Sequence, residues 1–183
     1  MTLSEQDSRL FFKLFLPLLK YVSQKLEPEY KYRQYEIKSA LSNAEYLETA
    51  RLLWKNDNLI DEYLAQLKTK DVTEDERAII EGWKRHVTGH YIIERHFDSG
   101  SVLINLETHN VYLVKGLTES WQELLRGHPL PAAVEATLLP FKDVIISDGL
   151  ISISRVVFGN DFREDCNRVY RDARRNKAML KNI

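Results

Sequence analysis

Apolar residues recur at steps of three and four along residues 4–26, which is the spacing of one face of an α-helix. The pattern predicts an amphipathic helix that Ser4 caps. Phe12 and Leu16 fall off the main stripe, so we expect apolar cover on a second side, either from this chain or from a partner. The stripe consists of Leu10, Phe11, Leu14, Phe15, Leu18 and Val22.

Three shorter helical patterns follow, joined by brief polar segments. Two of them begin with the spacing of a capping box, Ser42 with Glu45 and Thr73 with Glu76. We expect the third helix to continue through Val87. The apolar positions of the three patterns are Tyr46, Leu47, Ala50, Leu53 and Trp54, then Leu59, Ile60, Tyr63, Leu64 and Leu67, then Ile79, Ile80, Trp83 and Val87.

At Gly89 the apolar period changes from 3.6 residues to two, which predicts β-strands. Asp148-Gly149 lies between two apolar runs, and such a pair favours a type I′ turn, so we expect a hairpin there. A short helix is expected at 118–126. The expected strands are residues 91–97, 101–107, 111–114, 134–139, 144–147 and 150–154.

The last helical pattern has a narrow apolar stripe that must dock on an apolar surface, for which the sheet is the nearest candidate. Asn160 is expected to cap this helix. The stripe is Phe162, Cys166, Val169, Tyr170 and Ala173.

Together the elements predict an α+β fold. Residues 1–88 form a helical N-terminal portion. Residues 89–183 form a mostly antiparallel sheet of five to six strands, able to curl into a small barrel, with the C-terminal helix packed on it. The two portions can also form one compact unit.

Composition narrows the class of protein. The 183 residues are 44% hydrophobic and 29% charged, which is enough for a substantial core. A net charge of -1 disfavours sequence-independent binding along the length of a nucleic acid, which usually needs an excess of basic residues. The single cysteine excludes an internal disulfide, and we find neither a signal-peptide pattern nor an apolar run long enough to span a bilayer. We therefore expect a cytoplasmic protein without a membrane partner.

A metal site is one candidate for chemistry. His86 and His90 are four residues apart and Glu94 follows at the same step, the spacing that brings metal ligands together on a helix. Gly89 is expected to interrupt that helix. Cys166 lies on the stripe of the last helix and is interpreted as a core residue. The sequence has neither a nucleophile elbow nor a glycine-rich phosphate loop.

Two groups of residues are candidates for binding. Tyr30, Tyr32 and Tyr35 alternate with cations, a pattern suited to stacking on single-stranded nucleic acid or to packing at a protein rim. The last helix carries an excess of cations toward its end, which either complement the helix dipole or bind a phosphate backbone or an acidic protein. Its candidate binding residues are Arg171, Arg174 and Arg175.

The second half of the chain resembles a group of uncharacterised bacterial proteins, mostly from Firmicutes. The resemblance begins with Trp83, Lys84 and Gly89 ahead of a strand. It continues in a Leu-Leu-Pro-Phe-Lys segment that leads into an apolar strand and Asp-Gly, matched here by Leu138, Leu139, Pro140, Phe141, Lys142, Ile145, Ile146, Asp148 and Gly149. The resemblance implies no activity, cofactor or catalytic residue.

The sequence therefore predicts a non-enzymatic cytosolic binding or regulatory module that acts through protein–protein contacts, with a protein partner or a homodimer and no cofactor. Two alternatives stay open. One is nucleic-acid binding through the tyrosine-rich segment and the arginine helix, and the other is a metal-dependent hydrolase that uses His86, His90 and Glu94.

Overall fold

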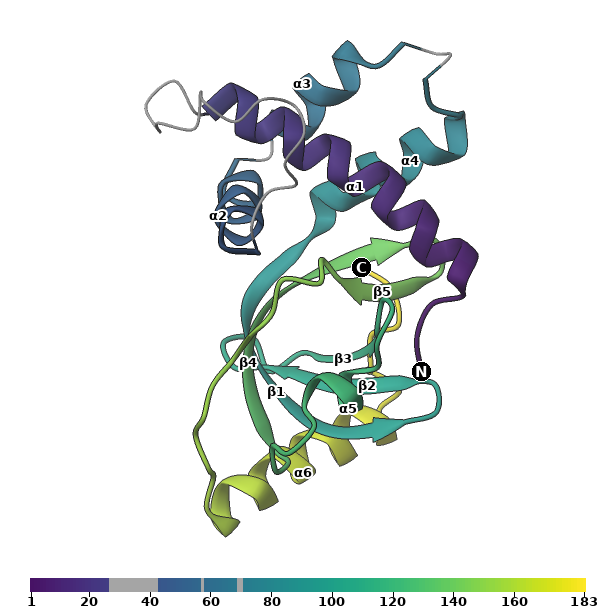
Figure 1. Cartoon of the computed structure of the whole chain (residues 1–183). Helices are drawn as coiled ribbons and strands as arrows, with labels where there is room; N and C mark the ends of the chain where they lie inside the picture. Colours follow the sequence, from purple (N-terminus) through teal and green to yellow (C-terminus); the bar gives the residue numbers. More distant parts are fainter. Residues whose placement is uncertain (27–42, 57, 69–70) are drawn as a thin grey trace. The chain divides into compact units, whose positions relative to one another are not determined.

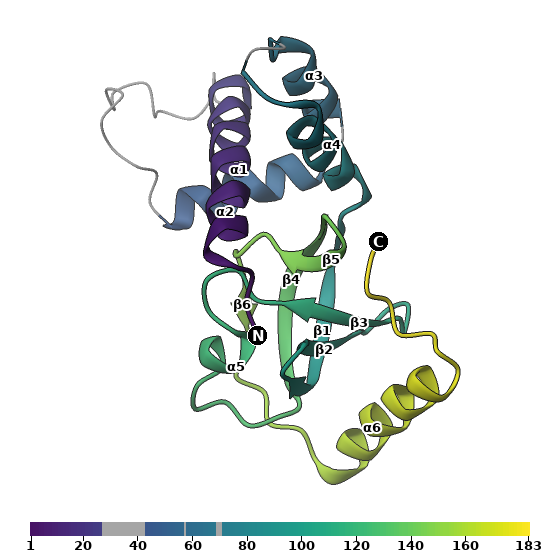
Figure 2. The same cartoon turned by 90° about the vertical axis from the view of Figure 1, so that its right-hand side faces the viewer.

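The computed structural model describes residues 1–26, 43–56, 58–68 and 71–183. The chain divides into two compact units (Figures 1 and 2). One, the helical unit, is Arg9–Lys84. The other, the barrel unit, joins Met1–Ser8 to Arg85–Ile183. No helix among the described residues is both long enough and apolar enough to cross a membrane.

The helical unit confirms the predicted helices. The helices are α1 (Glu5–Leu26), α2 (Asn43–Trp54), α3 (Asn58–Gln66) and α4 (Glu74–Gly82), followed by a single 3-10 turn at Trp83–Arg85. The first four residues of α1 and the last residue of the 3-10 turn fall within the barrel unit. Thr73 caps α4 in a complete capping box with Glu76, as predicted. Ser4 accepts a hydrogen bond from the backbone N–H of Asp7, which confirms the predicted cap of α1.

Aromatic rings fill the core of the helical unit. Phe11 and Phe15 of α1 both make edge contacts with Trp83, at centroid distances of 5.6 and 5.7 Å. Phe15 also stacks on Trp54 of α2 at 6.0 Å. The predicted stripe of α1 is buried from Phe11 to Val22, and Leu10 is half-buried. The helix that was expected to continue through Val87 is α4, and it ends at Gly82. The chain forms a 3-10 turn from Trp83 and is already in β1 at Val87.

The barrel unit contains a six-stranded sheet with the strand order β1-β2-β3-β5-β4-β6. An additional antiparallel pairing of β1 with β4 closes the first five strands into a ring. All pairings are antiparallel except that of β3 with β5. The strands are β1 (Val87–Phe97), β2 (Gly100–Asn105), β3 (Val111–Lys115), β4 (Ala132–Phe141), β5 (Val144–Ser147) and β6 (Ser152–Ile153). The expected α+β fold is therefore confirmed.

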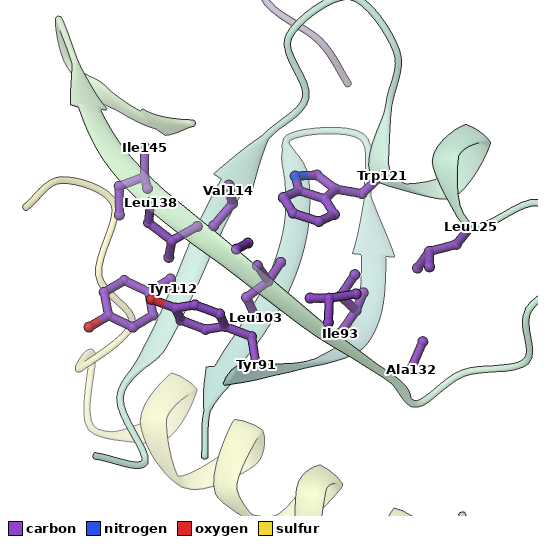
Figure 3. Close-up of a cluster of buried hydrophobic side chains, with 12 residues drawn as sticks. Tyr91, Ile93, Leu103, Tyr112, Val114, Trp121, Leu125, Ala132, Leu138 and Ile145 are labelled. Atoms are coloured by element: carbon purple, nitrogen blue, oxygen red, sulfur yellow. The ribbon is translucent and has the colours of Figure 1, made fainter. Parts of the chain in front are cut away.

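The barrel has an apolar interior and a second apolar cluster on its outside. Tyr91, Ile93 and Leu103 point inward (Figure 3), where they meet Trp121 of α5 (Trp121–Leu124) and Leu125, which follows α5. The alternate residues of the same strands point outward, as the two-residue period requires. The outward set is Ile92, Val102, Ile104 and Val111, which contact Cys166 and Tyr170 of α6 (Asn160–Arg175).

The predicted hairpin at Asp148-Gly149 is wrong. β5 and β6 do not pair with each other, because both run antiparallel to β4. The backbone N–H of Asp148 continues that ladder by donating to Thr137 at 3.1 Å. Gly149 then has a φ of 83°, and the Asp148 carboxylate accepts the backbone N–H of Leu150. The Asp-Gly pair thus forms an irregularity inside one interrupted strand.

Three smaller expectations also need correction. The second strand ends at Asn105, two residues early, because the Asn105 side-chain oxygen accepts the backbone N–H groups of Glu107 and Thr108 and starts a turn. The short helix is limited to α5, which Ser120 caps. Gly159 occupies the N-cap position of α6, and Asn160 is already helical.

Candidate functional site

The candidate site is the exposed surface of α6, a helix that packs on the outside of the barrel (Figure 1). Tyr170 is 2% exposed, and its ring lies against Phe97 of β1 at a centroid distance of 6.1 Å. The Arg95 guanidinium lies 4.0 Å from the centroid of the same ring. The predicted docking stripe of this helix is therefore confirmed.

Polar contacts reinforce this docking. Glu94 occupies an irregular position in β1, where the register with β2 shifts between Ile93 and Arg95. Its carboxylate is 8% exposed and accepts hydrogen bonds from the Arg95 guanidinium. Asn167 of α6 donates to the same carboxylate at 3.1 Å. The hydrogen bonds that Arg95 donates to Glu94 raise the pKa of the Arg95 guanidinium.

The outer face of α6 carries a row of arginines. Residues 168, 171 and 175 are spaced by three and four, so they lie on one face of the helix, opposite the buried Cys166. We call Arg168, Arg171 and Arg175 the arginine stripe. Arg174, the remaining predicted binding residue, lies one position before Arg175 and so falls on the flank of the helix.

The stripe is exposed and weakly paired. Arg168 and Arg175 each contact an aspartate three residues earlier on α6, and their side chains are 69% and 78% exposed. Exposed pairs of this kind contribute at most about 1 kcal/mol, so a partner can replace them. The Arg171 side chain makes no ion pair with any residue that the structure describes.

The predicted metal ligands occupy different surroundings. His86 lies just before β1, His90 is exposed on β1 opposite Glu135 of β4, and Glu94 is held by Arg95 and Asn167. Within the described ranges, no group of three or more His, Cys, Asp or Glu side chains is arranged to hold a metal ion. The hydrolase interpretation of these residues stays a prediction.

The remaining predicted residues are placed as follows. Tyr30, Tyr32 and Tyr35 lie outside the described residues. On α1, Phe12 is half-buried and Leu16 is 41% exposed, and a homodimer through these positions stays a prediction. Cys166 is 7% exposed, and its burial together with the nearby Glu94 raises the pKa of its thiol to about 11. It is a core residue, as predicted.

Sequence reasoning missed a pocket beside α5. The pocket has a volume of about 540 Å³ and lies between the end of β1, α5 and the turn that follows α5. Its lining includes His96, Glu123, Leu125, Arg126 and His128. No local pattern indicates this pocket, because His96 is separated from the other lining residues by two strands. The capping-box spacing of Ser120 and Glu123 was the one available signal, and it marks only the helix.

Comparisons of the chain with protein-family models, with curated proteins and with solved structures found no match.

Proposed function

We propose that this chain is a non-catalytic binding module that contacts an acidic protein surface through the arginine stripe of α6. The observation that carries the proposal is the two-sided construction of α6. One side is fixed to the barrel by Cys166 and Tyr170, and the opposite side presents Arg168, Arg171 and Arg175 to solvent. A docked helix holds such side chains in a defined row, which reduces the ordering cost of binding.

The chemistry of the stripe suits carboxylates. A guanidinium is planar, remains charged and donates two parallel hydrogen bonds to a carboxylate, and arginine is enriched in protein interfaces. The aspartates that neighbour Arg168 and Arg175 sit on the same exposed surface and are easily displaced. A complementary partner therefore presents two or three carboxylates along a helix or strand.

Nucleic-acid binding is the second candidate, and the barrel itself favours it. A closed ring of five strands in the order β1-β2-β3-β5-β4 resembles the OB-type barrel, which binds oligonucleotides across the outer face of strands 2 and 3. Here the outward residues Val102 and Ile104 of that face lie beneath α6. We therefore place the acidic protein first.

Fluorescence anisotropy with two labelled probes, an oligoglutamate peptide and a single-stranded oligonucleotide, tests the proposal. We expect the peptide to bind at low salt and binding to be lost in the triple variant R168Q/R171Q/R175Q. The matched control R174Q/K177Q/K181Q removes the same charge from outside the stripe and is expected to retain binding. Equal losses in both triple variants contradict the proposal. Stronger, steeply salt-dependent binding of the oligonucleotide supports the second candidate instead.

A further inference from the structure

The pocket beside α5 has the dimensions of a small-molecule site. Its volume of about 540 Å³ falls within the range of roughly 300 to 1,000 Å³ that is typical of ligand pockets. Leu125 and Leu130 give it an apolar wall, and its polar groups come from the end of β1 and from α5 and the following turn. No residue of α6 lines it, so the pocket is independent of the arginine stripe.

Backbone hydrogen bonds fix the rim of the pocket. The N–H of Arg126 donates to the carbonyl of Glu123 at 3.1 Å, and the N–H of His128 donates to the carbonyl of Leu125 at 2.8 Å. Leu125 itself is 3% exposed and belongs to the barrel interior. The segment that carries Arg126 and His128 is thus anchored at both ends of its turn.

The carboxylate in the lining is already engaged. One oxygen of Glu123 accepts both the backbone N–H and the hydroxyl of Ser120, at 2.8 and 2.7 Å. These bonds lower the pKa of Glu123, so it remains ionised while it caps α5. The same ionised carboxylate also attracts Arg126 electrostatically, without forming a direct ion pair with it.

Two further polar side chains of the lining, those of Arg126 and His128, have no hydrogen-bond partner among the described residues. His96 uses Nδ1 in a 2.7 Å hydrogen bond with Ser101, which leaves Nε2 available. Burial lowers the pKa of His96, so its ring is neutral at pH 7.

We propose that this pocket binds a small organic anion. Arg126 donates hydrogen bonds to its carboxylate or phosphate group, and His96 and His128 supply further hydrogen bonds. Leu125 and Leu130 contact its apolar body. An arginine disfavours a metal ion, and its planar fork matches both carboxylate and phosphate oxygens. The apolar wall favours a ring or short chain on the anion over a bare inorganic ion.

NMR titration of the full ¹⁵N-labelled chain tests this site with three probes of similar size: phenyl phosphate, benzoate and the neutral benzyl alcohol. We expect at least one anion to shift the Gly127 amide saturably, and benzyl alcohol to have a much smaller effect. The stronger anion identifies the phosphate or the carboxylate class. Loss of a charged hydrogen bond in R126Q is expected to weaken binding by about tenfold or more.

Two further variants complete the test. R126K keeps the charge but loses the fork, so an intermediate affinity is expected. R155Q removes an exposed arginine that does not line the pocket and should bind like the wild type. The proposal is overturned if neither anion shifts Gly127, if benzyl alcohol binds as well as the anions, or if R126Q retains full affinity with an otherwise unchanged spectrum.

Discussion

The guanidinium of Arg95 lies over the ring of Tyr170, 4.0 Å from its centroid, and this contact joins the barrel to α6. Arg95 belongs to β1 and Tyr170 to the middle of α6, so the pair spans the docking interface. The Glu94 carboxylate accepts hydrogen bonds from the same guanidinium, which restricts the position of the cation against the Tyr170 ring.

The first prediction concerns this pair. In a double-mutant cycle with R95M and Y170L, we expect a coupling free energy of about 0.5 to 2 kcal/mol for a partly buried cation–π contact. Urea unfolding of the four proteins measures it. Additive effects of the two substitutions contradict a direct contribution from the pair.

Cys166 reports on the docking of α6. With a thiol pKa of about 11 and a buried side chain, it should react with iodoacetamide at pH 8 more than about a hundredfold slower than in the urea-unfolded chain, since the thiolate is the nucleophile. Y170A is expected to accelerate the reaction by loosening α6. A native rate close to that of the unfolded chain means that α6 does not stay docked.

Glu76 makes the stability of the helical unit depend on pH. Hydrogen bonds from Lys13 and from the backbone N–H of Thr73 hold the pKa of Glu76 below its ordinary value of 4.5. A lowered pKa means that the ionised carboxylate stabilises the fold above the unfolded pKa, and that this contribution disappears as pH falls through the folded value.

We therefore expect wild type to unfold with a larger free energy than E76Q at pH 7, and the difference to shrink below about pH 4.5. Urea unfolding at several pH values measures this difference. The control E74Q changes another carboxylate in the first turn of α4 and should show a weaker pH dependence. A difference in unfolding free energy between wild type and E76Q that grows as the pH falls contradicts this prediction.

The substitution G116A tests how closely the backbone at Gly116 approaches the backbone at Glu119, just before α5. A Cβ atom at this position would lie 2.0 Å from the Glu119 carbonyl oxygen, a backbone atom. G116A is expected to lower the free energy of unfolding by about 3 kcal/mol or more, because backbone must move. At Gly159 a Cβ atom meets nothing within 4 Å, so G159A should cost about 1 kcal/mol or less. Denaturation midpoints of both variants decide whether the ranking holds.

Patterns local to one element predicted that element well. The three-and-four spacing of α1 and α6 gave their buried faces, because the side-chain direction on a helix follows directly from position. The Thr73–Glu76 box fixed the start of α4, since both hydrogen bonds form within four residues. The alternation after Gly89 likewise indicated strands, although the first strand begins at Val87, four residues before the expected start at Tyr91.

Features that depend on pairing between distant segments were not predictable in this way. Asp148-Gly149 has the composition of a hairpin turn, but the ladder to β4 was stronger than the local preference, and only the register with Thr137 reveals this. The pocket brings together His96 of β1 and Arg126, which follows α5, and β2 and β3 lie between them in the sequence. No spacing in the sequence therefore marks the pocket.

The central claim is that the arginine stripe of α6 binds a protein partner, and site-specific photocrosslinking in cells of the source organism tests it most directly. A photoreactive phenylalanine at position 171 is expected to give a discrete crosslinked protein, and the product should disappear when Arg168 and Arg175 are glutamine. The same probe at the exposed Thr118, away from α6, serves as the control position. Crosslinks to nucleic acid, or protein crosslinks unaffected by the two glutamines, contradict the account.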